Sequence, residues 1–313
     1  MDAVYHIPAL LEATIRGLNI QPEGIYADLT FGGGGHSRAI MECLGEGGRL
    51  YSFDQDREAY TNGERRPANS ARSLAEDERW HFVHGNFRYL SNYMDYYGVD
   101  ALDGVLADLG VSFHHFDSAE RGFSFRMDGP LDMRMNREGG KTAADIVNSY
   151  DEESLARVLY IYGEMKNARQ VARRLVQARQ TESIRTTEQL TQLLTPLCGR
   201  DKEKKDLARL FQALRIEVND EMGALREMLR SAGLLLRPGG RIAILTYHSL
   251  EDRIVKNFLR SGNIEGEIEK DFYGNILTPF RLIEKGLMAD AAEVARNPRS
   301  RSAKLRVAEK VES

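Results

Sequence analysis

The first third of the chain alternates short apolar runs with amphipathic or polar segments. An apolar run bounded by turn residues is typical of a buried strand, whereas apolar residues three and four apart are typical of a helix. Strands that alternate with helices indicate βαβ units and a parallel sheet. The pattern therefore predicts strands at 24–30, 48–56, 79–87 and 102–111, with a helix over 36–45 that a glycine closes.

The middle of the chain, from 142 to 199, has helical periodicity and almost no strand signal. Three or more helices are predicted there, with Ser183, Thr186 and Thr187 as candidate caps of the last one. We expect an all-helical insert at 137–204 that serves as a substrate-recognition domain. The remaining residues, 1–136 and 205–313, would form one discontinuous domain.

Strand signals return after a long helical segment, 207–236, which is expected to break near Asn219. The proline and glycines of 237–240 predict a turn that feeds the next strand. The other expected elements are strands at 241–249, 279–285 and 302–310 and a helix at 250–260. The predicted fold class is α/β, with a seven-stranded, mostly parallel sheet and an inserted all-helical domain.

Composition narrows the class of protein. The 313 residues carry a net charge of −4 and 42% hydrophobic residues, which is ordinary for a globular chain. No apolar run is long enough to span a membrane, and the N-terminus lacks the basic start of a secretory signal. Cys43 and Cys198 belong to no CxxC motif, so we expect no disulfide framework, no zinc ribbon and a cytoplasmic location. The seven histidines lack metal-ligand spacing, so no metal is predicted.

Four consecutive glycines, Gly32 to Gly35, follow the first predicted strand and precede a predicted helix. Such a turn is either a flexible connection or a place where a ligand approaches the backbone and the helix N-terminus closely. Asp28 ends the strand before the glycines, and Asp54 ends the next strand, where an acid can hold both hydroxyls of a ribose. Phe87 ends the third strand, where its ring can lie against an adenine.

Two cofactors fit this layout, a dinucleotide and S-adenosylmethionine. A dinucleotide places a pyrophosphate at the helix N-terminus, whereas S-adenosylmethionine carries an ammonium, a carboxylate and a sulfonium. An acid at the first turn repels a pyrophosphate and attracts an ammonium, so Asp28 favours S-adenosylmethionine. The seven-strand count and the glycine turn before the fifth strand point the same way.

A long segment rich in Arg, Phe, Met and Asp, residues 107–136, follows the fourth predicted strand. From Val111 to Arg137 it holds four basic and four acidic residues, so it is not a basic tail. One interpretation is a structured loop with internal ion pairs. The other is a loop over the active site whose arginines, Arg121, Arg126 and Arg134, contact RNA phosphates.

Several motifs resemble one family, the bacterial RsmH (MraW) family. The resemblance covers essentially the whole chain in order, and the run "ERGFSFRMDGPLDMRM" is its most specific part. The motifs that carry it are "HIPALLEATIRGL", "DLTFGGGGHS", "DLGVS", "AERGFSFRMDGPLDMRM", "FQALRIEVN", "YHSLEDRIVK" and "NPRSRSAKLRVAEK".

The resemblance implies a class I (Rossmann-like) methyltransferase domain with S-adenosylmethionine as cofactor. The implied reaction is methylation of the exocyclic N4 of a cytidine, at position 1402 in the decoding region of 16S rRNA. The implied partner is the small ribosomal subunit, with no membrane involved. The sequence does not decide between a monomer and a homodimer.

The cofactor contacts of the family carry over position by position. The last of them is His115, where the family more often has a glutamine, and a histidine can still donate or accept a hydrogen bond. The implied cofactor-binding residues are Gly34, Gly35, His36, Asp54, Phe87, Asp108 and His115. Asp28 is a further candidate, because an acid at the first turn attracts the ammonium of the cofactor.

Asp108 ends the fourth predicted strand, where many amino-methyltransferases place the acceptor of the amine hydrogens. Asp108 is either the general base or a residue that only binds the cofactor. Both alternatives stay open because the chain has "LGV" where such enzymes usually have "PPY". His248 and Ser249 end the fifth strand and would either line the target-base pocket or cap the next helix, with Ser249 as the N-cap.

The densest basic run in the chain lies near its end. It would be either a solvated edge strand or a contact with rRNA phosphates, and we favour the second through Arg299 and Arg301. The full run is Arg296, Arg299, Arg301, Lys304 and Arg306.

Three rival functions stay open at this point. They are a class I methyltransferase acting on another nucleic acid or a small molecule, a non-catalytic rRNA-binding assembly protein, and a nicotinamide dehydrogenase. The first two differ in whether S-adenosylmethionine is bound and consumed, and Asp28 argues against the third.

Overall fold

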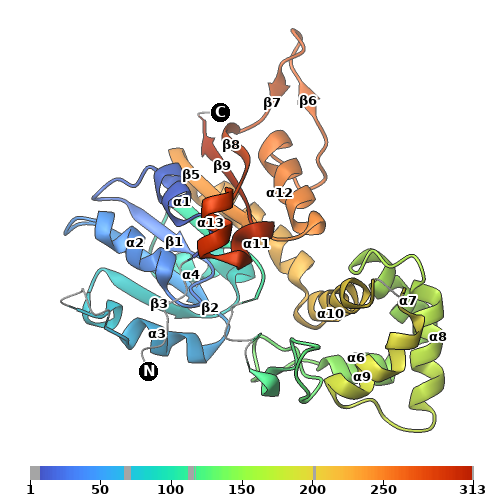
Figure 1. Cartoon of the computed structure of the whole chain (residues 1–313). Coiled ribbons are helices and arrows are strands. Elements are labelled where there is room, and N and C mark those ends of the chain that lie inside the picture. Colours follow the sequence, from blue (N-terminus) through green and yellow to red (C-terminus); the bar gives the residue numbers. More distant parts are fainter. Residues whose placement is uncertain (1–7, 67–71, 112–115, 117, 200–201, 312–313) are drawn as a thin grey trace. The chain divides into compact units, whose positions relative to one another are not determined.

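The computed structural model describes residues 8–66, 72–111, 116, 118–199 and 202–311 (Figure 1). The chain forms two compact units. The first consists of residues 1–110 together with 223–313, and the second of residues 111–222. In the described part of the chain, no helix is long and apolar enough to cross a membrane.

The first unit is built on a seven-stranded sheet with the order β3-β2-β1-β4-β5-β9-β8. The first five strands in that order are parallel, and β9 runs antiparallel to both β5 and β8. The predicted α/β class with a mostly parallel sheet is confirmed. The strands are β1 (Ile25–Asp28), β2 (Arg49–Asp54), β3 (Trp80–His84), β4 (Leu102–Asp108), β5 (Leu236–Thr246), β8 (Phe280–Met288) and β9 (Lys304–Lys310).

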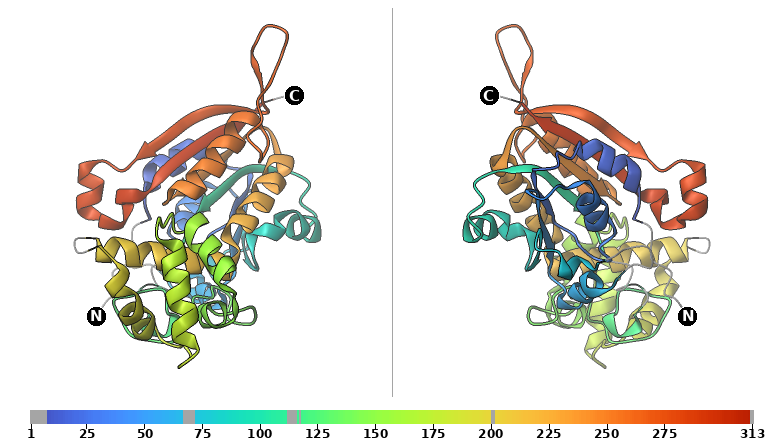
Figure 2. Two further views of the ribbon diagram at one scale, coloured as in Figure 1. Left: turned by 90° about the vertical axis from the view of Figure 1, so that its right-hand side faces the viewer. Right: turned by 90° about the vertical axis from the view of Figure 1, so that its left-hand side faces the viewer.

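Helices cover both faces of this sheet (Figure 2). One face packs on the helices α4 and α11, with α12 beside them, and the other packs on α1 and α2. Strands that are buried on both faces explain why the chain has continuous apolar runs instead of strict alternation. The helices of this unit are α1 (Leu11–Leu18), α2 (Gly35–Cys43), α3 (Tyr60–Glu64), α4 (Leu90–Tyr96), α12 (Ser249–Ser261) and α13 (Ala291–Arg296), with α11 (Glu221–Leu235) entering from the second unit.

The fifth strand differs from its predicted bounds. The proline and glycines at 237–240 lie inside β5 and do not precede it as a turn. Gly239 has a φ of 81°, and the pairing of β4 with β5 shifts register between Leu102 and Gly104. The turn residues therefore form an irregular start to the strand, where glycine supplies the left-handed backbone.

The second unit is helical and has its own core. Thr186 caps α9 and forms a reciprocal pair with Gln189, and Thr142 caps α6 with Asp145 in the same way. Residues from the loop before 137, such as Phe123 and Met133, belong to this core. The helices are α6 (Ala143–Ser149), α7 (Glu152–Ile161), α8 (Ala168–Arg179), α9 (Thr187–Leu194) and α10 (Glu203–Asn219).

The helical segment breaks where the sequence indicates. α10 ends at Asn219, and Asp220 adopts a left-handed conformation with a φ of 46°. The Asn219 side chain donates to the carbonyl oxygens of Met133 and Arg215, both at 2.8 Å, and accepts from the Met135 N–H at 2.8 Å. Asn219 therefore does more than end a helix, because its side chain connects the loop at Met133 and Met135 to α10.

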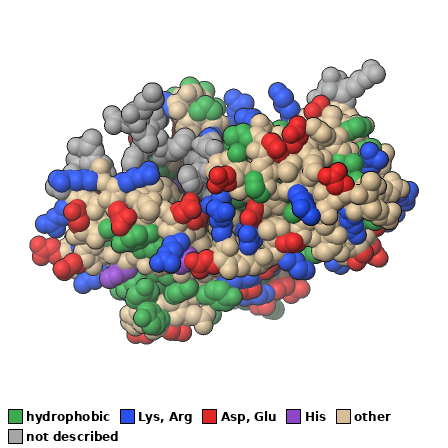
Figure 3. Space-filling model, turned by 90° about the horizontal axis from the view of Figure 1, so that it is seen from below, with side chains coloured by type: hydrophobic (Ala, Val, Ile, Leu, Met, Phe, Trp, Pro, Cys, Tyr) green, Lys and Arg blue, Asp and Glu red, His purple; other side chains and the backbone are tan. Residues whose placement is uncertain are grey.

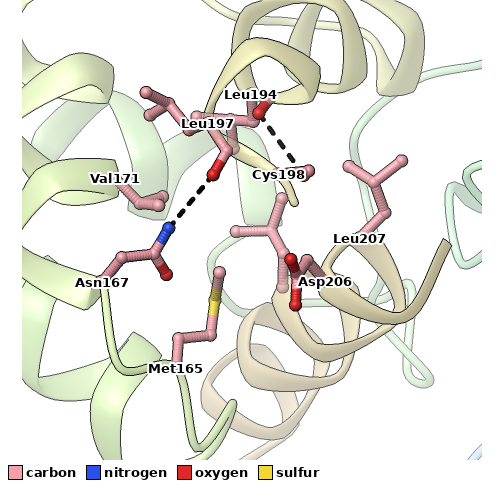
Figure 4. Close-up of a pocket in the computed structure, with 9 residues that line it drawn as sticks. Met165, Asn167, Val171, Leu194, Leu197, Cys198, Asp206 and Leu207 are labelled. Carbon is pink, nitrogen blue, oxygen red and sulfur yellow. Dashed lines mark hydrogen bonds between the residues drawn. The ribbon is translucent and has the colours of Figure 1, made fainter. Parts of the chain in front are cut away.

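A small apolar pocket lies within the helical unit (Figure 4). The Asn167 amide donates to the carbonyl oxygen of Leu197 at 3.3 Å, and the Cys198 thiol donates to that of Leu194 at 3.5 Å. Its polar groups are thus engaged in holding the helix ends. The lining residues are Met165, Asn167, Val171, Leu194, Leu197, Cys198, Asp206, Leu207 and Leu210.

Candidate active site

The glycine turn between β1 and α2 is open on one side and tightly packed on the other. A Cβ on Gly34, whose φ is 75°, would lie 2.8 Å from the Phe31 ring, and one on Gly35 would lie 2.3 Å from Pro8. A Cβ on Gly33 would meet no atom of the residues that the structure describes within 4 Å. Glycine is therefore required at Gly34 and Gly35 by packing and backbone conformation, while Gly33 leaves open space at the start of the helix.

Asp28 ends β1 and lies beneath this turn, 1% exposed. Its Oδ2 accepts from the Ser37 hydroxyl at 2.6 Å and its Oδ1 from the Thr30 N–H at 3.2 Å. Burial raises the pKa of Asp28 to about 6, against the opposing effect of these hydrogen bonds. Our expectation that Asp28 contacts the ammonium of the cofactor is therefore corrected, because a buried carboxylate with both oxygens engaged braces the turn.

The hydrogen bonds of Asp28 and Ser37 are part of a network that continues across the sheet. The Ser37 hydroxyl lies 2.7 Å from that of Ser52 on β2, and the Trp80 indole N–H of β3 donates to Ser52 at 2.9 Å. One chain of hydrogen bonds thus connects three neighbouring strands to the N-terminal turn of α2. Buried polar groups that are all satisfied fix a single geometry, so this network makes the glycine turn rigid.

Asp54 ends β2 beside the glycine turn, as predicted. Its Oδ2 accepts from the Gly32 N–H at 2.8 Å, and its Oδ1 accepts from the Asp56 N–H at 2.8 Å. The Asn62 amide holds the same glycine from the other side, donating to the Gly32 carbonyl oxygen at 2.8 Å. The acid is therefore preorganised at the carboxyl end of its strand.

Phe87 begins a short 3₁₀ helix directly after β3. Asn86 caps that helix by accepting from the Arg88 N–H at 3.0 Å. The Phe87 side chain is partly buried and packs against the core beneath the sheet. Its ring thus has a defined position at the same edge of the sheet as Asp54.

Asp108 ends β4, the strand next to β1, and its side chain is 22% exposed. Its Oδ1 accepts from the Tyr247 hydroxyl at 2.7 Å, and its own N–H donates to the Thr30 hydroxyl at 2.6 Å. Burial raises the pKa of Asp108 to about 7, with the carboxylates of Asp28 and Glu251 adding to the rise. Near neutral pH this carboxyl exists in both protonation states.

His36 occupies the first turn of α2 and is 5% exposed. Its Nδ1 lies 3.8 Å from Oδ2 of Asp108. Burial lowers the pKa of His36 to about 4, so the ring is neutral at physiological pH. Its Nε2 is buried and has no hydrogen-bond partner among the described residues.

Two residues of this site were missed by the sequence analysis. Tyr247 follows β5 directly and holds Asp108, while Thr30 connects Asp28 with Asp108 through its N–H and its hydroxyl. The available signal was position, because the carboxyl ends of adjacent parallel strands meet at one edge of a sheet. Burial and the Asp108 carboxylate raise the pKa of Tyr247, so its hydroxyl stays protonated and donates.

His248 is the N-cap of α12, a place that the sequence analysis gave to Ser249. Its Nδ1 accepts weakly from the Glu251 N–H at 3.5 Å, and the Glu251 carboxylate accepts in return from the N–H groups of Tyr247 and His248. The capping interpretation therefore holds with a different residue. A contact of His248 with the target base stays a prediction.

The predicted RNA-binding arginines of the second unit differ in environment. Arg121 is 3% exposed and donates to the carbonyl oxygens of Arg134 and Met135, both at 3.1 Å, so its assignment to RNA binding is corrected to loop packing. Arg134 forms a two-point ion pair with Asp132 at 2.7 and 2.9 Å. Arg126 is exposed. The predicted cofactor contact His115 lies outside the described residues.

The residues of the basic run near the end of the chain fall into two groups that differ in exposure and ion pairing. Arg301 is exposed and Arg299 is half-buried, on a short 3₁₀ helix. Lys304 and Arg306 belong to β9, an inner strand, and both pair with Asp252 at 2.7 to 3.1 Å. The edge-strand alternative is thus wrong for these two. Figure 3 shows basic and acidic side chains interspersed over one face of the molecule.

The residues present fit the predicted cofactor. The turn offers open space at Gly33, and the buried Nε2 of His36 has no hydrogen-bond partner among the described residues. The carboxylates of Asp54 and Asp108 flank the turn from β2 and β4, the two strands beside β1. Since parallel α/β sheets bind ligands outside the carboxyl ends of their strands, this is the expected place for an adenosine-containing ligand.

Comparison with known proteins gives one family. The model of the MraW methylase family matches residues 3–311. Proteins named "Ribosomal RNA small subunit methyltransferase H" are 58% identical over 312 residues in Parabacteroides distasonis, 56% over 310 in Bacteroides thetaiotaomicron and 53% over 316 in Porphyromonas gingivalis. Each alignment covers 99% of this chain, and 99%, 98% and 98% of these relatives respectively. The family predicted from the motifs is confirmed, and the chain belongs to the MraW methylase family.

Proposed function

We propose that this protein methylates the exocyclic N4 of a cytidine in 16S rRNA, at position 1402 of the decoding region, with S-adenosylmethionine as cofactor. The name of its relatives supports small-subunit ribosomal RNA as the substrate. The resemblance of the motifs supports the atom and the position. The observation that carries the chemistry is the position of Asp108, a partly exposed carboxyl at the end of β4 whose Oδ1 accepts from the Tyr247 hydroxyl at 2.7 Å. Burial raises the pKa of this carboxyl to about 7.

The cofactor would be held by the glycine turn, with the N-terminus of α2 facing its carboxylate and Asp54 facing its ribose. Phe87 would lie against the adenine, and Asp108 and His36 would complete the site. Once bound, the cofactor supplies an activated methyl group on a sulfonium. The protein's main contribution is then alignment, and the braced turn provides a fixed geometry for it.

The target amine needs help from the protein, because its lone pair is delocalised into the cytosine ring. We assign Asp108 as the group that accepts a hydrogen bond from N4 and takes its proton as the new bond to carbon forms. Tyr247 orients one carboxylate oxygen, which leaves Oδ2 directed away from that hydrogen bond. A pKa near the working pH suits this role, since the ionised form is populated and still basic.

Neither cysteine is suited to the alternative chemistry at C5 of cytosine, which needs a thiol adduct. Cys43 is exposed at the end of α2, and Cys198 belongs to the pocket in the helical unit. Amine methylation requires no such adduct.

We further propose that the helical unit recognises the substrate, with Arg126 and Arg134 there and Arg299 and Arg301 in the first unit contacting phosphates. The target base would leave its stack to reach Asp108. The proposed location is the cytoplasm, where ribosomal subunits are the substrate.

The test is to incubate the protein with labelled S-adenosylmethionine and small subunits from a strain that lacks the modification. We expect label in a single nucleotide, N4-methylcytidine at position 1402, located by nuclease digestion and mass spectrometry. Label at another base or atom would refute the assignment. Absence of binding in calorimetry with S-adenosylmethionine would instead favour a non-catalytic assembly protein.

A further inference from the structure

A two-stranded hairpin between α12 and β8 has no role in the site described above. Its strands are β6 (Glu269–Lys270) and β7 (Ile276–Leu277). Within the described part of the chain they pair only with each other and do not join the seven-stranded sheet. Figures 1 and 2 show the hairpin extending away from the sheet of its unit. An isolated hairpin is marginally stable in water, so a protruding one needs a reason.

The tip of the hairpin is ordered by hydrogen bonds. Asp271 Oδ1 accepts from the N–H groups of Tyr273 and Asn275, both at 2.8 Å, and its Oδ2 accepts from the Asn275 amide at 2.9 Å. Gly274 supplies a left-handed residue with a φ of 86°. The turn is therefore built by its own sequence, without support from a core.

This ordered tip presents two aromatic rings to solvent. Phe272 is 98% exposed and Tyr273 is 86% exposed, and their ring centroids are 5.8 Å apart in an edge-to-face arrangement. On the stem, Ile276 and Leu277 are exposed as well. Exposed aromatic side chains on a preorganised element lose little entropy on binding, which is the property of an interaction anchor.

The net charge of the hairpin indicates which kind of partner surface is complementary to it. Residues 263–279 hold four acids, Glu265, Glu267, Glu269 and Asp271, and one base, Lys270, which gives a local net charge of −3. Surfaces that stack nucleic-acid bases combine their aromatics with positive charge, and an acidic stem repels phosphates and anionic lipids. The complementary surface is a basic one.

We propose that the β6–β7 hairpin docks onto a protein, with Phe272 and Tyr273 in an apolar pocket and the acidic stem against its basic rim. Resting on the proposed function, the partner is a basic protein of the small ribosomal subunit and not the rRNA itself. The hairpin then anchors the enzyme on the assembled particle at a point away from the methylated base.

The first test compares Phe272→Ala/Tyr273→Ala with Tyr96→Ala, a matched loss of an aromatic side chain that is 81% exposed on α4. We expect the hairpin variant to raise the KM for small subunits about tenfold or more, as loss of an aromatic anchor does, with kcat, cofactor affinity and melting temperature unchanged. Tyr96→Ala leaves KM unchanged. An unchanged KM in the hairpin variant overturns the proposal.

A charge test separates protein from RNA. Glu267→Lys/Glu269→Lys reverses two exposed charges on the stem. Binding to small subunits, measured by sedimentation at several salt concentrations, weakens if the partner surface is basic. Tighter binding with a steeper salt dependence indicates RNA and overturns the proposal.

A crosslinking test identifies the partner whether or not methylation occurs. The photoreactive residue p-benzoylphenylalanine replaces Phe272 in one sample and Tyr96 in another, and each is irradiated with purified small subunits. A crosslink from position 272 to one ribosomal protein supports the proposal. Crosslinks to rRNA, to a second copy of this chain or to nothing overturn it. Failure of the proposed function appears separately, as absent methylation by the unmodified protein.

Discussion

Two aspartates end neighbouring strands of the sheet, yet they have opposite surroundings. Asp28 at the end of β1 is 1% exposed, and both of its oxygens accept hydrogen bonds from its own turn and helix. Asp108 at the end of β4 is 22% exposed, and its oxygens receive one hydrogen bond, from Tyr247, among those described. The two are connected through Thr30.

Two carboxylates at the same edge of one sheet can therefore have different functions, one structural and one chemical. A carboxylate whose acceptor sites are filled stabilises a conformation, whereas one with an open oxygen and a pKa of about 7 can exchange a proton with a ligand. Neighbouring strand ends therefore supply a fixed turn and a reactive group.

The largest effect is expected from Asp108→Asn. The amide keeps the shape and can accept from Tyr247 but cannot take a proton, so kcat should fall by about 10² to 10⁴-fold, the usual contribution of a general base. Single-turnover methylation of small subunits measures it, and calorimetry checks that S-adenosylmethionine still binds. Full activity in this variant would show that Asp108 only positions the cofactor.

Asp28→Ala should act on stability. It leaves the Ser37 hydroxyl and the Thr30 N–H without their buried acceptor, which costs about 1–3 kcal/mol of unfolding free energy. Urea unfolding followed by circular dichroism measures the loss. Asp108→Asn is the matched control and should lose no stability, because it replaces a carboxyl whose pKa burial raises with a neutral amide, so equal losses in both variants would remove the contrast.

The sequence predicted much of this fold because its signals are local. Strand runs, the glycine turn and the helical middle each follow from periodicity and turn chemistry, and the break at Asn219 lies where it was expected. The start of β5 was placed too late, because a proline and two glycines also fit an irregular strand start that pairs with β4.

The site was less predictable, because burial decides the roles of its residues. Asp28 and Asp108 both follow apolar runs, and nothing in their neighbours along the chain reveals which carboxylate is sealed. Arg121 proved to be buried, although Arg126 in the same motif is exposed. Tyr247 was missed since its partner is 139 positions away in the chain. Such roles depend on contacts between distant segments.

Tyr247→Phe should shift the pH dependence of the reaction. The hydroxyl lowers the pKa of Asp108, so its removal raises that pKa above about 7 and leaves less carboxylate at neutral pH. A rise of about one unit would lower kcat/KM at pH 7 roughly fivefold, with recovery at pH 9. A loss that persists at all pH values would mean that Tyr247 serves packing alone.

The smallest effect is expected from replacing His36, which tests whether the imidazole beside Asp108 is neutral or protonated and ion-paired. The folded-state pKa of His36, about 4, lies below the unfolded value of 6.5, so only the unfolded chain gains a proton as the pH falls from 7 to 6. The stability advantage of the wild type over His36→Asn, which does not titrate, should therefore shrink by about 0.7 kcal/mol over that interval. Urea titrations of both proteins in the same buffers measure this difference in unfolding free energy.

The opposite result is expected if the Asp108 carboxylate, 3.8 Å away, holds a protonated imidazole. The folded-state pKa of His36 would then be raised, and the difference in unfolding free energy would increase as the pH falls. The sign of the change therefore decides between the two.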